Sequence, residues 1–108
     1  DPKRIWQVAE TLSEDLGDLL GARGFYQFLL DNHPDFEKVQ SGDCLHRLAD
    51  ILYQFKEIPE ALRAYRELRE RYPDHRAIKG DEDTPAAKRR IELLYQLLEK
   101  MGCKSKDK

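Results

Sequence analysis

The feature that most constrains the fold is a four-residue pattern that occurs twice at matched spacing. A small residue is followed by an aromatic residue four positions later, by a leucine three positions further on, and by a proline after five more. The two copies are Ala22, Tyr26, Leu29 and Pro34, and Ala61, Tyr65, Leu68 and Pro73. Residues three and four apart share one face of a helix, and proline ends a helix. The pattern therefore predicts a repeated helical unit.

The composition fits one small domain built from amphipathic helices. Of the 108 residues, 40% are hydrophobic and 37% are charged, which suits helices with one apolar face and a long solvated face. The formal net charge is −2, so the chain as a whole has no basic footprint for nucleic acid. No apolar run approaches the roughly 18 residues that predict a membrane span. Cys44 and Cys103 are too few for a disulfide framework, which favours a reducing compartment.

Apolar periodicity and helix-breaking residues divide the chain into five predicted helices. Gly17 ends the first helix, Pro59 fits the first turn of the fourth, and Thr84–Pro85 suits the start of the fifth. The expected helices cover residues 3–16, 18–32, 43–55, 60–73 and 85–101. They form a domain over 1–102, with hairpins at 3–34 and 43–73, connectors at 35–42 and 74–84, and a disordered tail at 103–108. Phe36 and Val39 in the first connector are expected to pack back onto the preceding hairpin.

Hairpins of this kind, each closed by a proline, resemble the tetratricopeptide repeat. In the second unit, Leu45, Leu48, Ala49 and Leu52 match the residue classes of the family's first helix, and the copy in 61–73 matches its second helix. The last helix resembles the first half of a third unit. The predicted core residues of the repeats are Trp6, Ala22, Tyr26, Leu29, Pro34, Leu45, Leu48, Ala49, Leu52, Ala61, Tyr65, Leu68, Pro73, Ile91, Leu94 and Leu98.

The first unit departs from the family at Ala9, Glu10 and Ser13, and the two closing prolines lie 39 residues apart, against a family period of about 34. The resemblance implies an all-α fold of about two and a half units that forms a short right-handed solenoid, with the fifth helix as a cap. The half-a-tetratricopeptide repeat of RNA-processing scaffolds is a relative with looser spacing. Trp6 and Gly17 are compatible with that variant, but the second unit lacks its tryptophan.

By register with the family, the first helix of each unit lines a concave groove. The resemblance implies a non-enzymatic interaction or scaffold module, free-standing or within a larger assembly, that binds a partner peptide or helix there. The predicted partner-binding residues are Gln7, Thr11, His46, Asp50, Tyr53, Gln54, Arg89 and Gln96. The family's Lys and Asn clamp for a C-terminal carboxylate is not expected, because Asp50 at a key position would repel that group.

Two other kinds of partner stay open. The half-repeat variant would contact RNA or RNA-binding proteins, and arginines cluster around the fourth helix, but interleaved glutamates there indicate an ion-paired solvated face. An unpaired final helix would expose Leu93, Leu97 and Leu98 and self-associate with a second copy. Bacterial envelope lipoproteins have repeats with similar connectors and Tyr-Pro endings, so a periplasmic location stays open beside the cytoplasm.

Metal, cofactor and catalytic sites are not expected. Cys44 and His46 are two residues apart, whereas ligands on one face of a helix need a spacing of three or four. The chain has no paired-cysteine motif, no glycine-rich phosphate loop, no nucleophile elbow and no HExxH helix. Cys44 is instead predicted to be a semi-buried small residue at the start of a helix.

Overall fold

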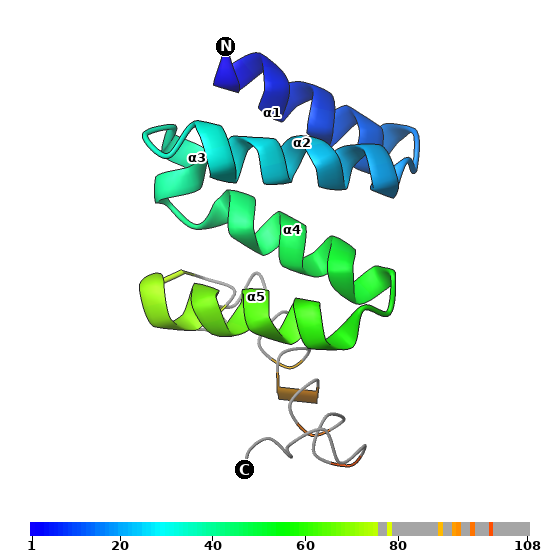
Figure 1. The fold of residues 1–108 in the computed structure, drawn as a ribbon, viewed down its shortest axis with the longest axis vertical. Helices are drawn as coiled ribbons and strands as arrows, with labels where there is room; N and C mark the ends of the chain where they lie inside the picture. The colour runs from blue at the N-terminus through cyan, green and yellow to red at the C-terminus, as the bar shows by residue number, and fades with distance from the viewer. Residues whose placement is uncertain (76–77, 79–88, 90–91, 94–95, 97–99, 101–108) are drawn as a thin grey trace.

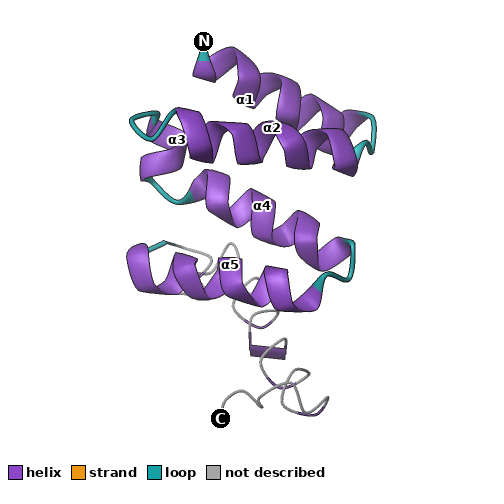
Figure 2. Ribbon diagram, in the orientation of Figure 1, coloured by secondary structure: helices purple, strands orange, loops and turns teal. Residues whose placement is uncertain are grey.

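The computed structural model describes residues 1–75 together with 78, 89, 92–93, 96 and 100, and the long described segment consists of helices joined by short loops (Figure 2). In chain order, the helices are α1 (Pro2–Glu10), η1 (Thr11–Asp15), α2 (Leu19–Asn32), α3 (Glu37–Gln40), α4 (Asp43–Gln54) and α5 (Ile58–Arg71). The prediction of an all-α fold is confirmed. Among the described helices, none has the length and apolar character needed to span a bilayer.

The four long helices lie side by side in chain order and alternate in direction (Figure 1). α1 packs on α2, α2 on α4, and α4 on α5, so the two predicted hairpins stack through α2 and α4. The predicted bounds of the first four helices agree with the structure to within about two residues, apart from the first helix, whose last turns form η1.

Local signals account for the ends of these helices. Gly17 has a φ of +69°, and the Asp18 amide donates to the Leu12 carbonyl, which is the ending expected of a left-handed glycine. The Asp18 carboxylate then accepts from the Gly21 amide at 3.0 Å and caps α2. In η1, the Leu16 amide donates to the carbonyl of Thr11, five residues earlier, so this turn is π-helical rather than α-helical.

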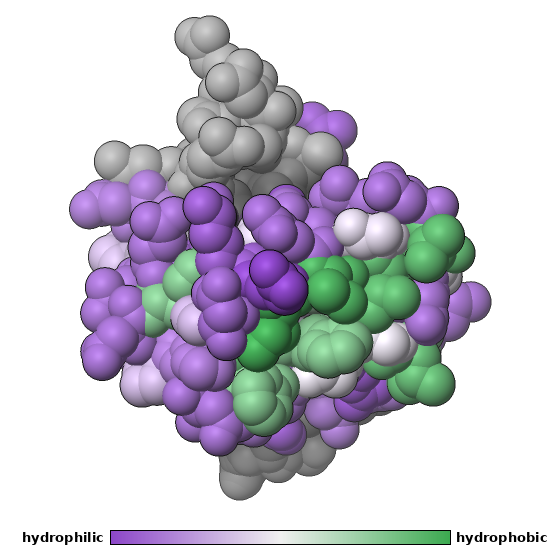
Figure 3. Space-filling model, turned by 90° about the horizontal axis from the view of Figure 1, so that it is seen from above, coloured by the Kyte–Doolittle hydropathy of each residue, from purple (hydrophilic) through white to green (hydrophobic). Residues whose placement is uncertain are grey.

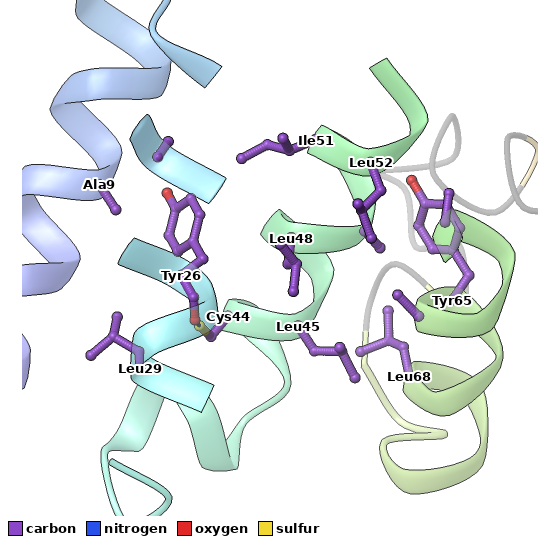
Figure 4. Close-up of a cluster of buried hydrophobic side chains, with 14 of the residues drawn as sticks. Ala9, Tyr26, Leu29, Cys44, Leu45, Leu48, Ile51, Leu52, Tyr65 and Leu68 are labelled. Atoms are coloured by element: carbon purple, nitrogen blue, oxygen red, sulfur yellow. Dashed lines mark hydrogen bonds between the residues drawn. The ribbon is translucent and has the colours of Figure 1, made fainter. Parts of the chain in front are cut away.

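The repeated pattern forms the centre of the core. Both predicted trios, Ala22, Tyr26 and Leu29, and Ala61, Tyr65 and Leu68, are at most 1% exposed. Trp6 is buried and meets the edge of the Tyr26 ring, with the ring centroids 5.3 Å apart. Side chains from α2 and α4 interdigitate around Tyr26, Cys44 and Leu48 (Figure 4). Among the described residues, six that are buried in the core were not in the predicted repeat core: Ala9, Val39, Cys44, Ile51, Leu62 and Ala64.

Several expectations need correction. Pro34 and Pro73 were grouped with the core but are exposed, and each comes directly after the C-cap residue of its helix. Leu16, the last residue of the predicted first helix, follows η1 and is 69% exposed. The connector 35–42 contains the short helix α3, whose Val39 is buried and whose Phe36 contacts Trp6 with ring centroids 6.4 Å apart. α3 lies in the connector between the two hairpins, where the 39-residue spacing of the closing prolines leaves more residues than the family period of about 34.

The final helix at 85–101 lies mostly outside the described residues, as do the connector 79–84 and the tail 103–108. The predicted core residues Ile91, Leu94 and Leu98 belong to that part. Leu93 is described and is 55% exposed, whereas Leu97 is not among the described residues. The expectations for a capping helix and for a solenoid of two and a half units therefore stay predictions.

Candidate functional site

The first helix of the first hairpin, which comprises α1 and η1, and the first helix of the second hairpin, α4, border a groove that we call the α1–α4 groove. Its centre is Arg47 on α4, whose guanidinium lies 3.1 Å from the Glu10 carboxylate and 3.0 Å from the Glu14 carboxylate. The same guanidinium donates to the Tyr26 hydroxyl at 3.3 Å and lies over the Trp6 ring, 5.3 Å from its centroid. Arg47 therefore joins the two hairpins across the groove.

Arg47 also divides the groove into two hollows. The first, of about 390 Å³, is lined by Trp6, Glu10, Lys38, Asp43, His46, Arg47 and His75. The second, of about 370 Å³, is lined by Ser13, Glu14, Leu19, Tyr26, Arg47, Asp50, Ile51 and Gln54. Four carboxylates face two permanent cations along these walls, Lys38 and Arg47, so the lining carries a negative excess.

The wall contributed by α4 is a chain of coupled polar side chains. The Tyr65 hydroxyl donates a hydrogen bond to Asp50, which fixes that carboxylate against α5. His46 Nε2 lies 3.3 Å from Asp50 Oδ2, but this buried nitrogen forms no hydrogen bond with any described residue. Burial lowers the pKa of His46, although the charge of Asp50 opposes the shift. The groove wall therefore favours the neutral form of the His46 imidazole over the protonated form.

His75 closes the first hollow from the segment that follows α5. Its Nε2 lies 2.8 Å from Asp43 Oδ1, and its ring meets the His46 ring edge-on, with the centroids 5.2 Å apart. Burial acts to raise the pKa of Asp43, but the hydrogen bond and charge of His75 outweigh it, so the pKa is lowered. These contacts hold the start of α4 against the end of the second hairpin.

The predicted binding residues are only partly brought together. His46, Asp50 and Gln54 line the hollows, whereas Gln7, Thr11 and Tyr53 line neither of them. Gln7 and Thr11 are exposed on the first helix, and Tyr53 is half-buried. Arg89 and Gln96 are exposed, but the helix predicted to carry them lies largely outside the described part of the chain, so their place relative to α4 stays a prediction.

Sequence reasoning missed the residues that shape the groove most directly, namely Glu10, Lys38, Asp43, Arg47 and His75. In the sequence, Glu10 was a departure from the tetratricopeptide pattern and was compatible with the half-repeat variant, but it was not predicted to bind a partner. Its partner Arg47 is 37 residues away, and no local periodicity connects two side chains at that separation. Of the five missed residues, only Asp43 and Arg47 lie on the same predicted helix as His46 and Asp50. Their position on that helix was the only feature of the sequence that could have identified them as groove residues.

Cys44 belongs to the core rather than to the groove. It is fully buried, its thiol contacts the Tyr26 carbonyl at 3.4 Å, and burial raises its pKa to about 12. The expectation of a semi-buried cysteine is therefore wrong. Within the described residues, no three His, Cys, Asp or Glu side chains are grouped so that they could hold a metal ion.

A larger hollow of about 580 Å³ lies elsewhere, where the C-terminal ends of α2 and α5 meet α3. None of the predicted binding residues lines it. At its rim, Arg71 pairs with Glu67 at 2.8 Å. This ion pair on α5 agrees with the ion-paired solvated face that the sequence predicted for the fourth helix.

Comparison with known families supports the repeat. A family model described as a tetratricopeptide repeat matches residues 43–75, the segment that contains α4 and α5. Searches of curated proteins and of solved structures found no match to the chain.

Proposed function

We propose, from the tetratricopeptide repeat that the chain contains at residues 43–75, that the protein is an interaction module whose α1–α4 groove receives a partner segment. Tetratricopeptide repeats in general serve protein–protein interaction or scaffolding and are generally non-catalytic. The observation that carries the proposal is the pair of hollows on the first helices of both hairpins, on either side of Arg47.

The lining indicates the chemistry of the partner segment. Glu14 is 60% exposed at its side chain and keeps carboxylate surface available to a ligand beyond its pair with Arg47. The negative excess along the walls favours a segment that carries lysine or arginine. The two hollows lie in line along the helices, which suits an extended peptide or one face of a helix.

A photo-crosslinking side chain tests the position of the groove directly. We would replace Gln54, which is exposed at the second hollow, and compare it with the same replacement at Glu70, an exposed residue on α5. The proposal expects one protein from the source lysate to be crosslinked from position 54 and not from position 70. Addition of salt should reduce this capture, because charge attraction is screened.

Three results would contradict the proposal. Equal crosslinking from both positions would mean that the contact is not confined to the groove. Crosslinking from position 70 alone would move the site to α5. Capture of RNA without protein would favour the RNA-processing alternative.

A further inference from the structure

The first hairpin carries an apolar surface that the second hairpin lacks. Outside this hairpin, Leu93 is the only large hydrophobic residue that is exposed among those the structure describes. Those within the hairpin are Val8, Leu16, Leu20, Phe25 and Phe28. Viewed from the α1 end of the stack, apolar side chains gather over the hairpin face that points away from α4 (Figure 3). Patches of this kind mark interaction surfaces.

The internal repeat identifies part of this surface as a helix-packing position. The register that aligns the two units moves residue numbers by 39, so Cys44, Arg47 and Ile51 correspond to Ile5, Val8 and Leu12. In α4 this side faces the first hairpin, as the contacts of Cys44 and Arg47 with Tyr26 show. On the equivalent side of α1, Val8 is 40% exposed, whereas Ile5 and Leu12 are partly buried against the core.

The charges at the two ends of α1–η1 indicate what covers this side. Arg4 is exposed in the first turn of α1, four residues before Val8, and Asp15 is exposed at the end of η1, seven residues after it. Neither side chain is ion-paired with another described residue. An antiparallel partner of the same sequence would place Asp15 opposite Arg4 at both ends, whereas a parallel partner would oppose like charges.

We propose that a second copy of this chain covers this surface, with the α1 helices of the two copies packed antiparallel about a twofold axis. Val8 of one copy then lies near Leu12 of the other, and two Arg4–Asp15 pairs flank the apolar contact. In the antiparallel arrangement the two helix dipoles also point in opposite directions, and this favours the contact. A twofold interface of this kind uses the same patch on both copies, as most homodimers do.

Sedimentation equilibrium of the full chain over a wide concentration range tests this arrangement. Val8→Glu should lower the dimer affinity by at least about tenfold, because it buries an unpaired carboxylate. Arg4→Asp and Asp15→Arg should each weaken the dimer at low salt, and the double exchange should restore it. Arg63→Asp, the same charge change at an exposed position on α5, should leave the dimer unaffected.

The charge exchange makes the outcome specific to this geometry. Circular dichroism would first establish that every variant keeps its helical content. A chain that is monomeric at all concentrations would overturn the proposal, and so would a dimer that tolerates Val8→Glu. A dimer lost in Val8→Glu but not recovered by the double charge exchange would overturn the antiparallel arrangement.

Discussion

The guanidinium of Arg47 on α4 lies 3.1 Å from the carboxylate of Glu10 on α1, and this pair spans the two hairpins on the side of the candidate groove. Both side chains are about one-third exposed, so water screens the pair only partly. Burial disfavours the charged guanidinium, but the nearby Tyr26, Glu10 and Glu14 outweigh it and raise the pKa of Arg47. The pair is therefore a structural link as well as part of the groove lining.

A double-mutant cycle measures that link. Arg47→Gln and Glu10→Gln should each destabilise the fold by roughly 1 kcal/mol, with a coupling of about 0.5 kcal/mol between them. Urea unfolding followed by circular dichroism gives the four free energies. The exposed pair Arg71–Glu67 on α5 serves as the control and should couple less strongly. Equal coupling in both pairs would show that Arg47 does not link the hairpins.

Two glycines with positive φ should respond differently to alanine. Gly17 has open space around its missing Cβ, so Gly17→Ala should cost only the left-handed strain of about 1 kcal/mol. At Gly42, with φ +93°, a Cβ would lie 2.9 Å from Tyr72 Cγ and 3.2 Å from Leu68 Cδ1. Gly42→Ala should therefore cost at least about 2 kcal/mol, since strain and overpacking add. Thermal unfolding of both variants checks this order, and a larger loss at Gly17 would contradict it.

His46 should make the fold sensitive to acid. Its pKa is lowered in the folded state from an ordinary value of 6.5, so the unfolded chain binds the proton more readily. Stability is then full above pH 6.5 and falls as the pH drops through the folded-state pKa. His46→Gln should flatten this part of the profile of unfolding free energy against pH. An unchanged slope in the variant would assign the acid sensitivity to another group.

Cys44 should be unreactive while the protein is folded. Its burial and its pKa of about 12 leave almost no thiolate near neutral pH. In a Cys103→Ser background, a thiol reagent should label Cys44 only as fast as the fold opens. Labelling that rises with denaturant in step with the loss of circular dichroism would fit this expectation. Rapid labelling under native conditions would mean that α2 and α4 separate readily.

The sequence was sufficient for α2, α4 and α5 because their determinants are local. Ala61, Tyr65 and Leu68 share a face by spacing alone, and Gly17 and Pro34 stop helices through their own backbone constraints. The same register also predicted most of the core. It was wrong about Pro34 and Pro73, because matching a repeat position does not establish burial.

The groove was less predictable because its residues meet only after the hairpins stack. His46, Asp50 and Gln54 were found through their position on a first helix. Lys38 was missed because it lies in the segment expected to be a connector, and His75 because it follows the second hairpin. Neither position shows a periodicity that links it to α4.

The sequence by itself determined, to within about two residues, where α2, α4 and α5 begin and end, and it showed that two units repeat. These properties depend on residues within one or two helical turns of each other. Only the tertiary structure decided that Arg47 pairs with Glu10, that Cys44 is fully buried and that Val8 faces outward. Such outcomes depend on the distance and angle between stacked hairpins, and packing across many residues sets these rather than any local pattern.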